Sequence, residues 1–123
     1  MTQTLAHRGP DAAGTHLLAE RGLALGHRRL AILDTSPEGN QPMMSASGRY
    51  WLAYNGETYN FPDLRARLQQ EGASVPWRGT SDTEILLACF DAWGVLATMK
   101  RTHGMCAFAC YDVHEDAMWL VRD

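Results

Sequence analysis

The sequence has no apolar run that approaches the roughly 20 residues needed to cross a bilayer. Its first residues lack the charged-then-apolar order of a signal peptide. Its formal net charge is −3 and its arginines are scattered, so it offers no basic surface for nucleic acid. Its three cysteines form no Cys-x-x-Cys motif and have no histidine at ligand spacing. These absences argue against a membrane span, secretion, nucleic-acid binding and a metal centre. They favour a cytoplasmic protein with free, mostly buried thiols.

The composition is that of an ordinary globular domain, with 46% hydrophobic and 20% charged residues in a chain of 123. This length favours one domain with a real core. We find no repeat, linker or low-complexity tract. No glycine-rich loop that could cradle phosphates is visible, so the chain is expected to bind no nucleotide and no other cofactor.

Alternating apolar residues bounded by turn residues predict strands at Thr15–Ala19, Leu23–Ile32 and Tyr50–Tyr54. Amphipathic spacing predicts a helix over 61–71, capped by Asn60, and a stronger helix from a Ser81–Glu84 capping box to Gly94. Residues 95–101 favour a short third helix, and Met105–Tyr111 with Ala117–Val121 favour a hairpin. Strands, then helices, then a hairpin indicate an α+β layered domain rather than alternating βαβ units.

Two segments carry a family resemblance: His7-Arg8-Gly9-Pro10-Asp11 and Tyr54-Asn55-Gly56-Glu57-Thr58-Tyr59-Asn60. With Gly26-His27-Arg28-Arg29-Leu30 and Gln41-Pro42, they resemble the glutaminase domain of class II glutamine amidotransferases, most closely the asparagine synthetases. The resemblance runs from about Leu5 to Asp123 and implies a four-layer αββα sandwich of the N-terminal-nucleophile hydrolase type. That family has its first strand and its cysteine nucleophile well before the first segment, and continues beyond the last residue. We therefore expect residues 1–123 to be a partial domain whose first strand is missing.

The resemblance assigns an oxyanion hole to Asn55 and Gly56. Amide hydrolysis through a thioester passes a tetrahedral oxyanion, which needs fixed donors about 3 Å away, such as a side-chain amide and a backbone N–H. The alternative is a turn at the end of a strand, because Asn-Gly is a strong turn dipeptide. Thr58 departs from the isoleucine that the family commonly has, which bears on packing rather than on the oxyanion hole.

The resemblance also assigns the two ends of an amino-acid substrate. Arg29 is the expected clamp of the α-carboxylate, since a planar guanidinium can grip a carboxylate with two parallel hydrogen bonds. Asp82 is the expected partner of the α-ammonium group, with Glu57 near the same end. Each has a structural alternative: Arg29 could be a solvated arginine on a strand, and Asp82 could serve only the dipole of its helix. His27 is expected to be structural, and Gln41-Pro42-Met43 to shape a loop over the pocket.

A nucleophile is not apparent. An N-terminal cysteine uses its own α-amine as the base for its thiol, and no internal cysteine has a free amine. Cys89 is expected on the apolar face of a helix, and Cys106 and Cys110 on a strand, where cysteine behaves as a small hydrophobe. Removal of Met1 would expose Thr2, but only four residues lie between Thr2 and His7, which is too short for the strand and helix that the family has there.

Two functions remain open at this stage. The first is the glutaminase of an asparagine synthetase-like enzyme, which hydrolyses glutamine to glutamate and ammonia for the ATP-dependent amidation of aspartate. ATP and Mg²⁺ would then belong to a synthetase domain that this chain lacks, and without its nucleophile the chain alone would be inactive. The second is a non-catalytic module that binds glutamine or a partner. A missing first strand would leave an exposed sheet edge, so self-association is also expected.

Overall fold

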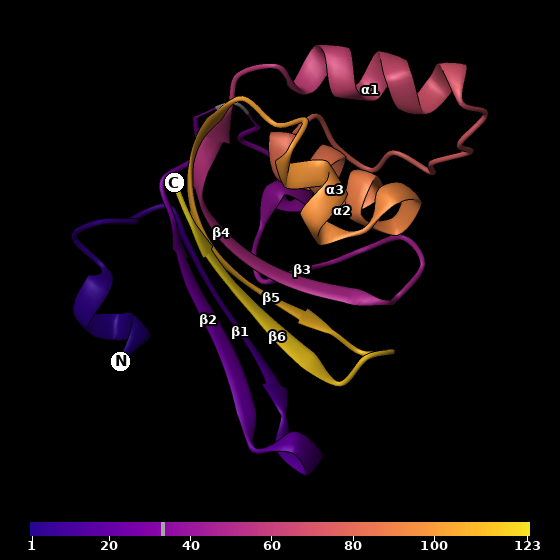
Figure 1. Cartoon of the computed structure of the whole chain (residues 1–123). Helices are drawn as coiled ribbons and strands as arrows, with labels where there is room; N and C mark the ends of the chain where they lie inside the picture. Colours follow the sequence, from indigo (N-terminus) through magenta and orange to yellow (C-terminus); the bar gives the residue numbers. More distant parts are fainter. Residues whose placement is uncertain (33) are drawn as a thin grey trace.

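The computed structural model describes residues 1–32 and 34–123 (Figure 1). The strands are β1 (Ala12–Leu18), β2 (Leu23–Arg29), β3 (Met43–Met44), β4 (Tyr50–Thr58), β5 (Gly104–Asp112) and β6 (Ala117–Arg122). The α-helices are α1 (Phe61–Gln70), α2 (Asp82–Trp93) and α3 (Val95–Met99), and single 3₁₀ turns form η1 (Thr2–Leu5), η2 (Ala19–Arg21) and η3 (Pro37–Gly39). The structure thus confirms the predicted α+β class.

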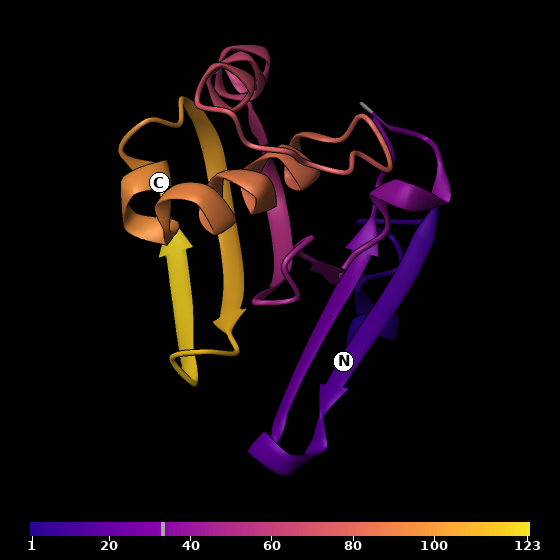
Figure 2. The same ribbon diagram turned by 90° about the vertical axis from the view of Figure 1, so that its right-hand side faces the viewer.

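The strands form two antiparallel sheets. The smaller sheet is the β1–β2 hairpin, and the larger sheet has the order β3-β4-β5-β6. Helices α1, α2 and α3 cover one side of the larger sheet, whereas the hairpin lies away from them and reaches beyond the sheet (Figures 1 and 2). The His16 ring of β1 stacks on Trp51 of β4 at a centroid distance of 3.4 Å, which joins the two sheets.

The core lies between the larger sheet and the helices. Along β4 the side chains of Tyr50, Leu52 and Tyr54 are buried, because alternate residues of a strand face the same side. They pack with Leu86, Leu87 and Phe90 of α2 and with Phe108 and Cys110 of β5. A second cluster joins Leu64 and Leu68 of α1 to Ile85, Ala88 and Cys89 of α2. The odd-numbered residues of β4 are left for the opposite side of the sheet.

The bounds of β1, β2 and β4 differ from the sequence prediction. Strand β1 begins at Ala12 instead of Thr15 and ends at Leu18 instead of Ala19, and β2 ends at Arg29 instead of Ile32. The pairing stops there because Pro10 has no N–H to continue the ladder, and the backbone of Ala31 donates instead to the Asp11 carboxylate. Strand β4 continues to Thr58. Asn55 and Gly56 pair with Ala107 and Cys106 inside this strand, so the alternative that they form a turn is wrong.

Of the two predicted helix caps, the one at Asn60 is wrong and the one at Ser81 is confirmed in part. Asn60 precedes α1, but its side chain donates to the Arg101 carbonyl and accepts from His103 N instead of capping the helix. Ser81 does cap α2, because its Oγ accepts from Glu84 N at 3.2 Å. The reciprocal bond of a capping box is absent among the described residues, since the Glu84 carboxylate accepts from Arg78 N and Gly79 N.

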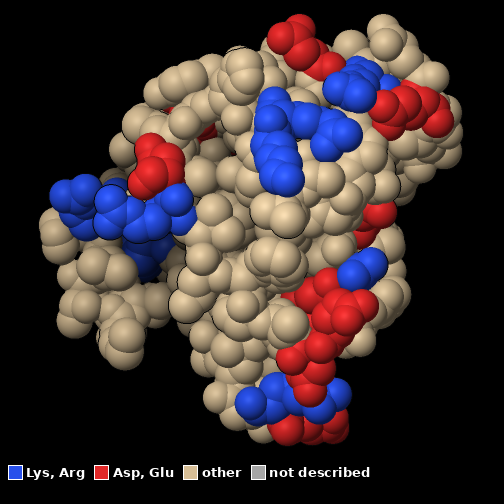
Figure 3. Space-filling model, viewed as in Figure 1, with Lys and Arg blue, Asp and Glu red and all other residues tan. Residues whose placement is uncertain are grey.

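Three of the four expected layers are described: the helices, the larger sheet and the hairpin. On the outer side of β2, the described residues supply only η1, where the Thr2 methyl lies against Gly26 (Figure 1). Of the helices in residues 1–32 and 34–123, none combines the length and apolar character that crossing a bilayer requires. On the face shown in Figure 3, acidic and basic side chains lie in small mixed groups.

Candidate functional site

A cleft of about 750 Å³ lies where the end of β2 approaches β4 and β5. Ala107 and Ala109 of β5 line it together with Ala53, so small side chains keep it open. The residues that the sequence predicts for the site all line this cleft: Arg29 from β2, Asn55, Gly56 and Glu57 from β4, and Asp82 from the start of α2. The fold therefore gathers five residues that are spread over 54 sequence positions, from 29 to 82.

Gly56 occupies a position where backbone crowding excludes a side chain. A Cβ atom there would lie 2.2 Å from the Met105 carbonyl oxygen and 2.8 Å from Cys106 Cα. Asn55, the preceding residue, is exposed and lines the cleft. The strand therefore presents a side-chain amide next to a glycine peptide, which is the donor pair expected of an oxyanion hole.

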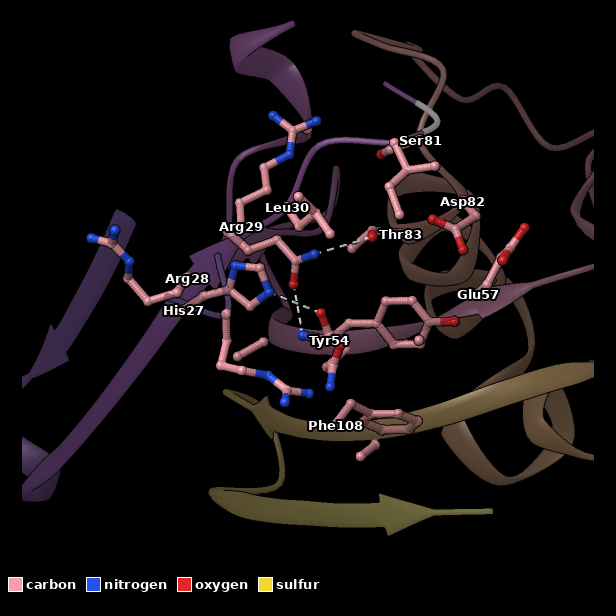
Figure 4. Close-up of a pocket in the computed structure, with 18 of the residues that line it drawn as sticks. His27, Arg28, Arg29, Leu30, Tyr54, Glu57, Ser81, Asp82, Thr83 and Phe108 are labelled. Carbon is pink, nitrogen blue, oxygen red and sulfur yellow. Dashed lines mark hydrogen bonds between the residues drawn. The ribbon is translucent and has the colours of Figure 1, made fainter. Parts of the chain in front are cut away.

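Asp82 is buried at the first turn of α2, where its side chain is 7% exposed. Its Oδ2 accepts from Thr58 N at 2.9 Å. Burial raises the pKa of this carboxyl group, and hydrogen bonds from backbone N–H groups oppose the rise without cancelling it. The Glu57 carboxylate adds to the rise and lies beside Asp82 in Figure 4. A cation placed between these two acids would relieve this electrostatic cost.

Thr58, the residue that departs from the family pattern, is fully enclosed at 1% exposure. Its hydroxyl lies 3.2 Å from the Tyr54 hydroxyl, so the two buried polar groups satisfy each other. Burial raises the pKa of Tyr54, which keeps that hydroxyl protonated. The threonine is thus accommodated at this position.

Arg29 is buried, and its guanidinium group is engaged by the loop that follows β2. Nη1 donates to the Ser36 carbonyl at 2.7 Å and to Asn40 Oδ1 at 3.0 Å. Nη2 donates to the Asp34 carbonyl. These bonds leave Nε–H and one Nη2 hydrogen without an assigned acceptor among the described residues. The neighbouring Arg28 points elsewhere and donates from Nε to the Gly9 carbonyl at 2.9 Å, as expected for adjacent residues of a strand.

Asp34 is a cleft residue for which the sequence analysis predicted no role. Its Oδ1 accepts from the N–H and hydroxyl of Ser36, at 2.8 and 2.6 Å. Its Oδ2 accepts from Thr80 N at 2.8 Å. These hydrogen bonds, those from Ser36 first, lower the pKa of Asp34 to about 2. Asp34 therefore ties the loop that holds Arg29 to the segment that leads into Asp82.

The three cysteines do not supply a nucleophile to the cleft. Among the described residues that line it there is no cysteine. All three thiols are free, and burial raises the pKa of each of them, to about 12 for Cys89 and Cys110. The thiolate form that acts as a nucleophile is therefore disfavoured. Residues 1–32 and 34–123 also contain no group of three or more His, Cys, Asp or Glu side chains that could hold a metal ion.

The fold is that of a glutamine amidotransferase domain. A family model described as a glutamine amidotransferase domain matches residues 1–123, and the chain belongs to this family. "Amidase chry2" of Gibberella zeae is 37% identical over 119 residues, which are 97% of this chain and 17% of that protein. "Asparagine synthetase [glutamine-hydrolyzing] 1" of Bacillus subtilis is 35% identical over 123 residues, which are 100% of this chain and 18% of that protein.

A solved structure gives the same assignment. Glutamine phosphoribosylpyrophosphate amidotransferase from B. subtilis, complexed with ADP and GMP, matches with a TM-score of 0.64 and 27% identity, over 81% of this chain and 23% of that one. The family and the fold type expected from the sequence are thereby confirmed. The chain spans about a fifth of the length of these relatives. The roles of the individual residues remain predictions.

Proposed function

We propose that this chain is the glutaminase part of an asparagine synthetase-like amidotransferase, which hydrolyses glutamine to glutamate and ammonia. The observation that carries the proposal is the convergence of Arg29, Asn55, Gly56, Glu57 and Asp82 on one cleft. These residues offer groups complementary to each polar part of glutamine. Family membership supports the same reaction class.

In this proposal the α-ammonium group of glutamine binds between Asp82 and Glu57. Burial makes the charge of Asp82 costly in the free protein, and this supports a role in binding a cation. The α-carboxylate binds the free donors of Arg29. The side-chain amide lies at Asn55 and the N–H of Gly56, which stabilise the oxyanion once a nucleophile attacks the amide carbon.

Attack on the amide carbon needs a thiol activated by a base, and the cleft-lining residues that the structure describes include no cysteine. We therefore expect residues 1–123 alone to bind glutamine without hydrolysing it. The same observation favours the second candidate function, a non-catalytic glutamine-binding module. Ammonia release by the protein isolated from its own cells would support the first function, and binding without ammonia release would support the second.

Calorimetric titration of the purified chain with L-glutamine tests the binding site directly. L-norvaline is a suitable control ligand, because it has the same α-amino and α-carboxyl groups but no side-chain amide. Glutamine is expected to bind more tightly than norvaline, and Asn55→Ala is expected to remove this advantage. Equal affinity for the two ligands, or no binding at all, would contradict the proposed site.

The ammonia would be consumed by a synthetase domain in the ATP-dependent amidation of aspartate, with ATP and Mg²⁺ bound by that domain. The relative named asparagine synthetase supports aspartate as the acceptor, whereas the relative named as an amidase leaves room for another acceptor. An ammonia-dependent assay of the complete protein with aspartate and with other carboxylic acids would decide between them. We place this activity in the cytoplasm, where free cysteines such as these stay reduced.

We also propose that the chain alone self-associates through exposed apolar strand surfaces. Leu17 on β1 and Leu120 on β6 are 69% and 78% exposed, and Leu30 after β2 is 57% exposed. Such surfaces next to strand edges favour pairing between copies. Sedimentation velocity should show dimers or larger species that Leu120→Glu diminishes. A concentration-independent monomer would rule this out.

A further inference from the structure

Gln41 lines the cleft, and both the oxygen and the nitrogen of its side-chain amide form hydrogen bonds. The residue is 9% exposed. Its Oε1 accepts from Tyr54 N at 2.6 Å, and its Nε2 donates to Thr83 Oγ1 at 3.3 Å. One side chain thus joins strand β4 to the first turn of helix α2.

The register of the sheet explains why a side chain is needed at this point. Strand β3 pairs with β4 through Met43 with Leu52 and Met44 with Trp51. The same register would place Gln41 opposite Tyr54, where the structure has no further backbone ladder within the described residues. The Tyr54 N–H would then be a buried donor without an acceptor, which is destabilising. The Gln41 side chain supplies that acceptor.

His27 satisfies the other backbone group of Tyr54. Its Nε2 lies 3.0 Å from the Tyr54 carbonyl oxygen, as the dashed line in Figure 4 marks. Because a carbonyl only accepts, Nε2 carries the proton. Burial lowers the pKa of His27, so the ring is neutral and its buried Nδ1 has no partner among the described residues. Two side chains therefore hold the edge of β4 where the strand is not paired.

The Tyr54 peptide leads directly into Asn55 and Gly56, and Thr83 directly follows Asp82. If the proposed function is correct, these are the places that bind the side-chain amide and the α-ammonium group of glutamine. A bridge between them sets how far apart the two ends of a bound amino acid can be. Glutamine and asparagine carry the same polar groups but differ by one methylene in that separation.

We infer that Gln41 is a positioning residue that fixes the spacing between the Asn55-Gly56 donors and Asp82, and so selects glutamine over asparagine. The inference rests on the proposed function. It differs from a general stabilising role, because a residue that only stabilised the fold would affect the two amino acids equally.

The test measures the dissociation constants of glutamine and asparagine for the wild type and for Gln41→Met, which has a similar length and cannot form either hydrogen bond. Gln69→Met, at an exposed position of α1, is the matched control. We expect Gln41→Met to weaken glutamine binding about tenfold, the effect of one or two buried hydrogen bonds, and asparagine binding much less. Equal weakening of both ligands, or an unchanged preference, would overturn the inference.

Amide spectra of the ligand-free chain separate this inference from the proposed function. We expect Gln41→Met to speed hydrogen exchange of the Tyr54 amide and to shift the amide resonances of Asn55, Gly56 and Thr83. If the wild type fails to bind glutamine, the proposed function fails, and unchanged spectra would overturn the positioning role as well. Should Gln41→Met fail to fold, Thr83→Val removes only the second hydrogen bond. An unchanged preference for glutamine in that variant would also overturn the inference.

Discussion

Asp34 and Asp82 line the same cleft and are similarly shielded from solvent, at 6% and 7% exposure, yet the pKa values of their carboxyl groups shift in opposite directions. Asp34 accepts hydrogen bonds from the backbone and hydroxyl groups of Ser36 and Thr80, and its pKa falls to about 2. Asp82 Oδ2 accepts from Thr58 N at 2.9 Å, the carboxyl group lies near Glu57, and its pKa is raised. A similar exposed fraction therefore does not mean an equal environment, because burial is the largest cause of the raised pKa of Asp82, whereas hydrogen bonds dominate at Asp34.

The difference indicates that the two aspartates have different roles. The charge of Asp34 is already satisfied by the protein, so it has little to gain from a ligand and serves to hold two loops together. The charge of Asp82 is incompletely satisfied, so part of its cost is relieved only when a cation arrives. Substitutions that remove one charge at a time should separate these two roles.

Asp82→Asn should give the largest effect, and on binding rather than on stability. The asparagine can still accept from Thr58 N, so we expect the free energy of unfolding to stay the same or to rise. Glutamine affinity should fall about 100-fold, because removing one partner of a desolvated charge pair costs about 2 to 5 kcal/mol. Calorimetry and urea unfolding measure the two effects.

The matched control is Asp63→Asn, an exposed aspartate in the first turn of α1, which should change neither quantity. Asp82 would lose its proposed role if Asp82→Asn bound glutamine as well as the wild type. A large loss of stability in Asp82→Asn would instead make this aspartate a structural residue like Asp34.

Asp34→Asn should give the reverse pattern, with stability affected more than binding. Its amide cannot accept on both sides, so the donors from either Ser36 or Thr80 lose their acceptor. We expect the free energy of unfolding to fall by about 2 kcal/mol, as is typical for hydrogen bonds to a charged group. Urea unfolding measures this loss, with Asp63→Asn again as the control. A variant as stable as the wild type would show that the hydrogen bonds to the Asp34 carboxylate contribute little.

The sequence predicts features that depend on interactions within one segment better than features that depend on contacts between distant segments. Helix α2 was predictable because Ser81 and the apolar stripe that follows it act within one segment. The convergence of Arg29, Asn55 and Asp82 was expected only through the family resemblance, since no local pattern relates positions that lie on different elements. The family match and the shared cleft agree with that expectation, while the roles themselves still await the tests above.

Asp34 and Gln41 show what the sequence could not reveal. Asp34 stands in a loop of turn-forming residues, and its partner Thr80 lies 46 positions away. Gln41 belongs to a segment whose resemblance suggested only a loop over the pocket, and its contacts to Tyr54 and Thr83 depend on where strand β3 begins. Such long-range polar contacts follow from the packed fold, and a repeated local pattern does not encode them. The sequence did contain one indication. Asp34 and Gln41 are polar residues that follow Arg29 closely in the chain, and such residues are candidates for holding a site residue in place.

The smallest expected effect is on the pH dependence of the free energy of unfolding. Here the two carboxyl groups should act in opposite directions. The pKa of Asp34 in the folded protein lies below its ordinary value of 3.8, so its contribution to stability is present above that pH and is lost as the pH falls toward 2. The pKa of Asp82 lies above 3.8, so its contribution is favourable when protonated and is lost as the pH rises through the folded pKa. Urea unfolding of the wild type and both variants between pH 2 and 7 measures this. The difference between wild type and Asp34→Asn should shrink on acidification, whereas Asp82→Asn should gain on the wild type as the pH rises. Parallel curves for the two variants would mean that the two carboxyl groups do not differ in the way that their hydrogen bonds indicate.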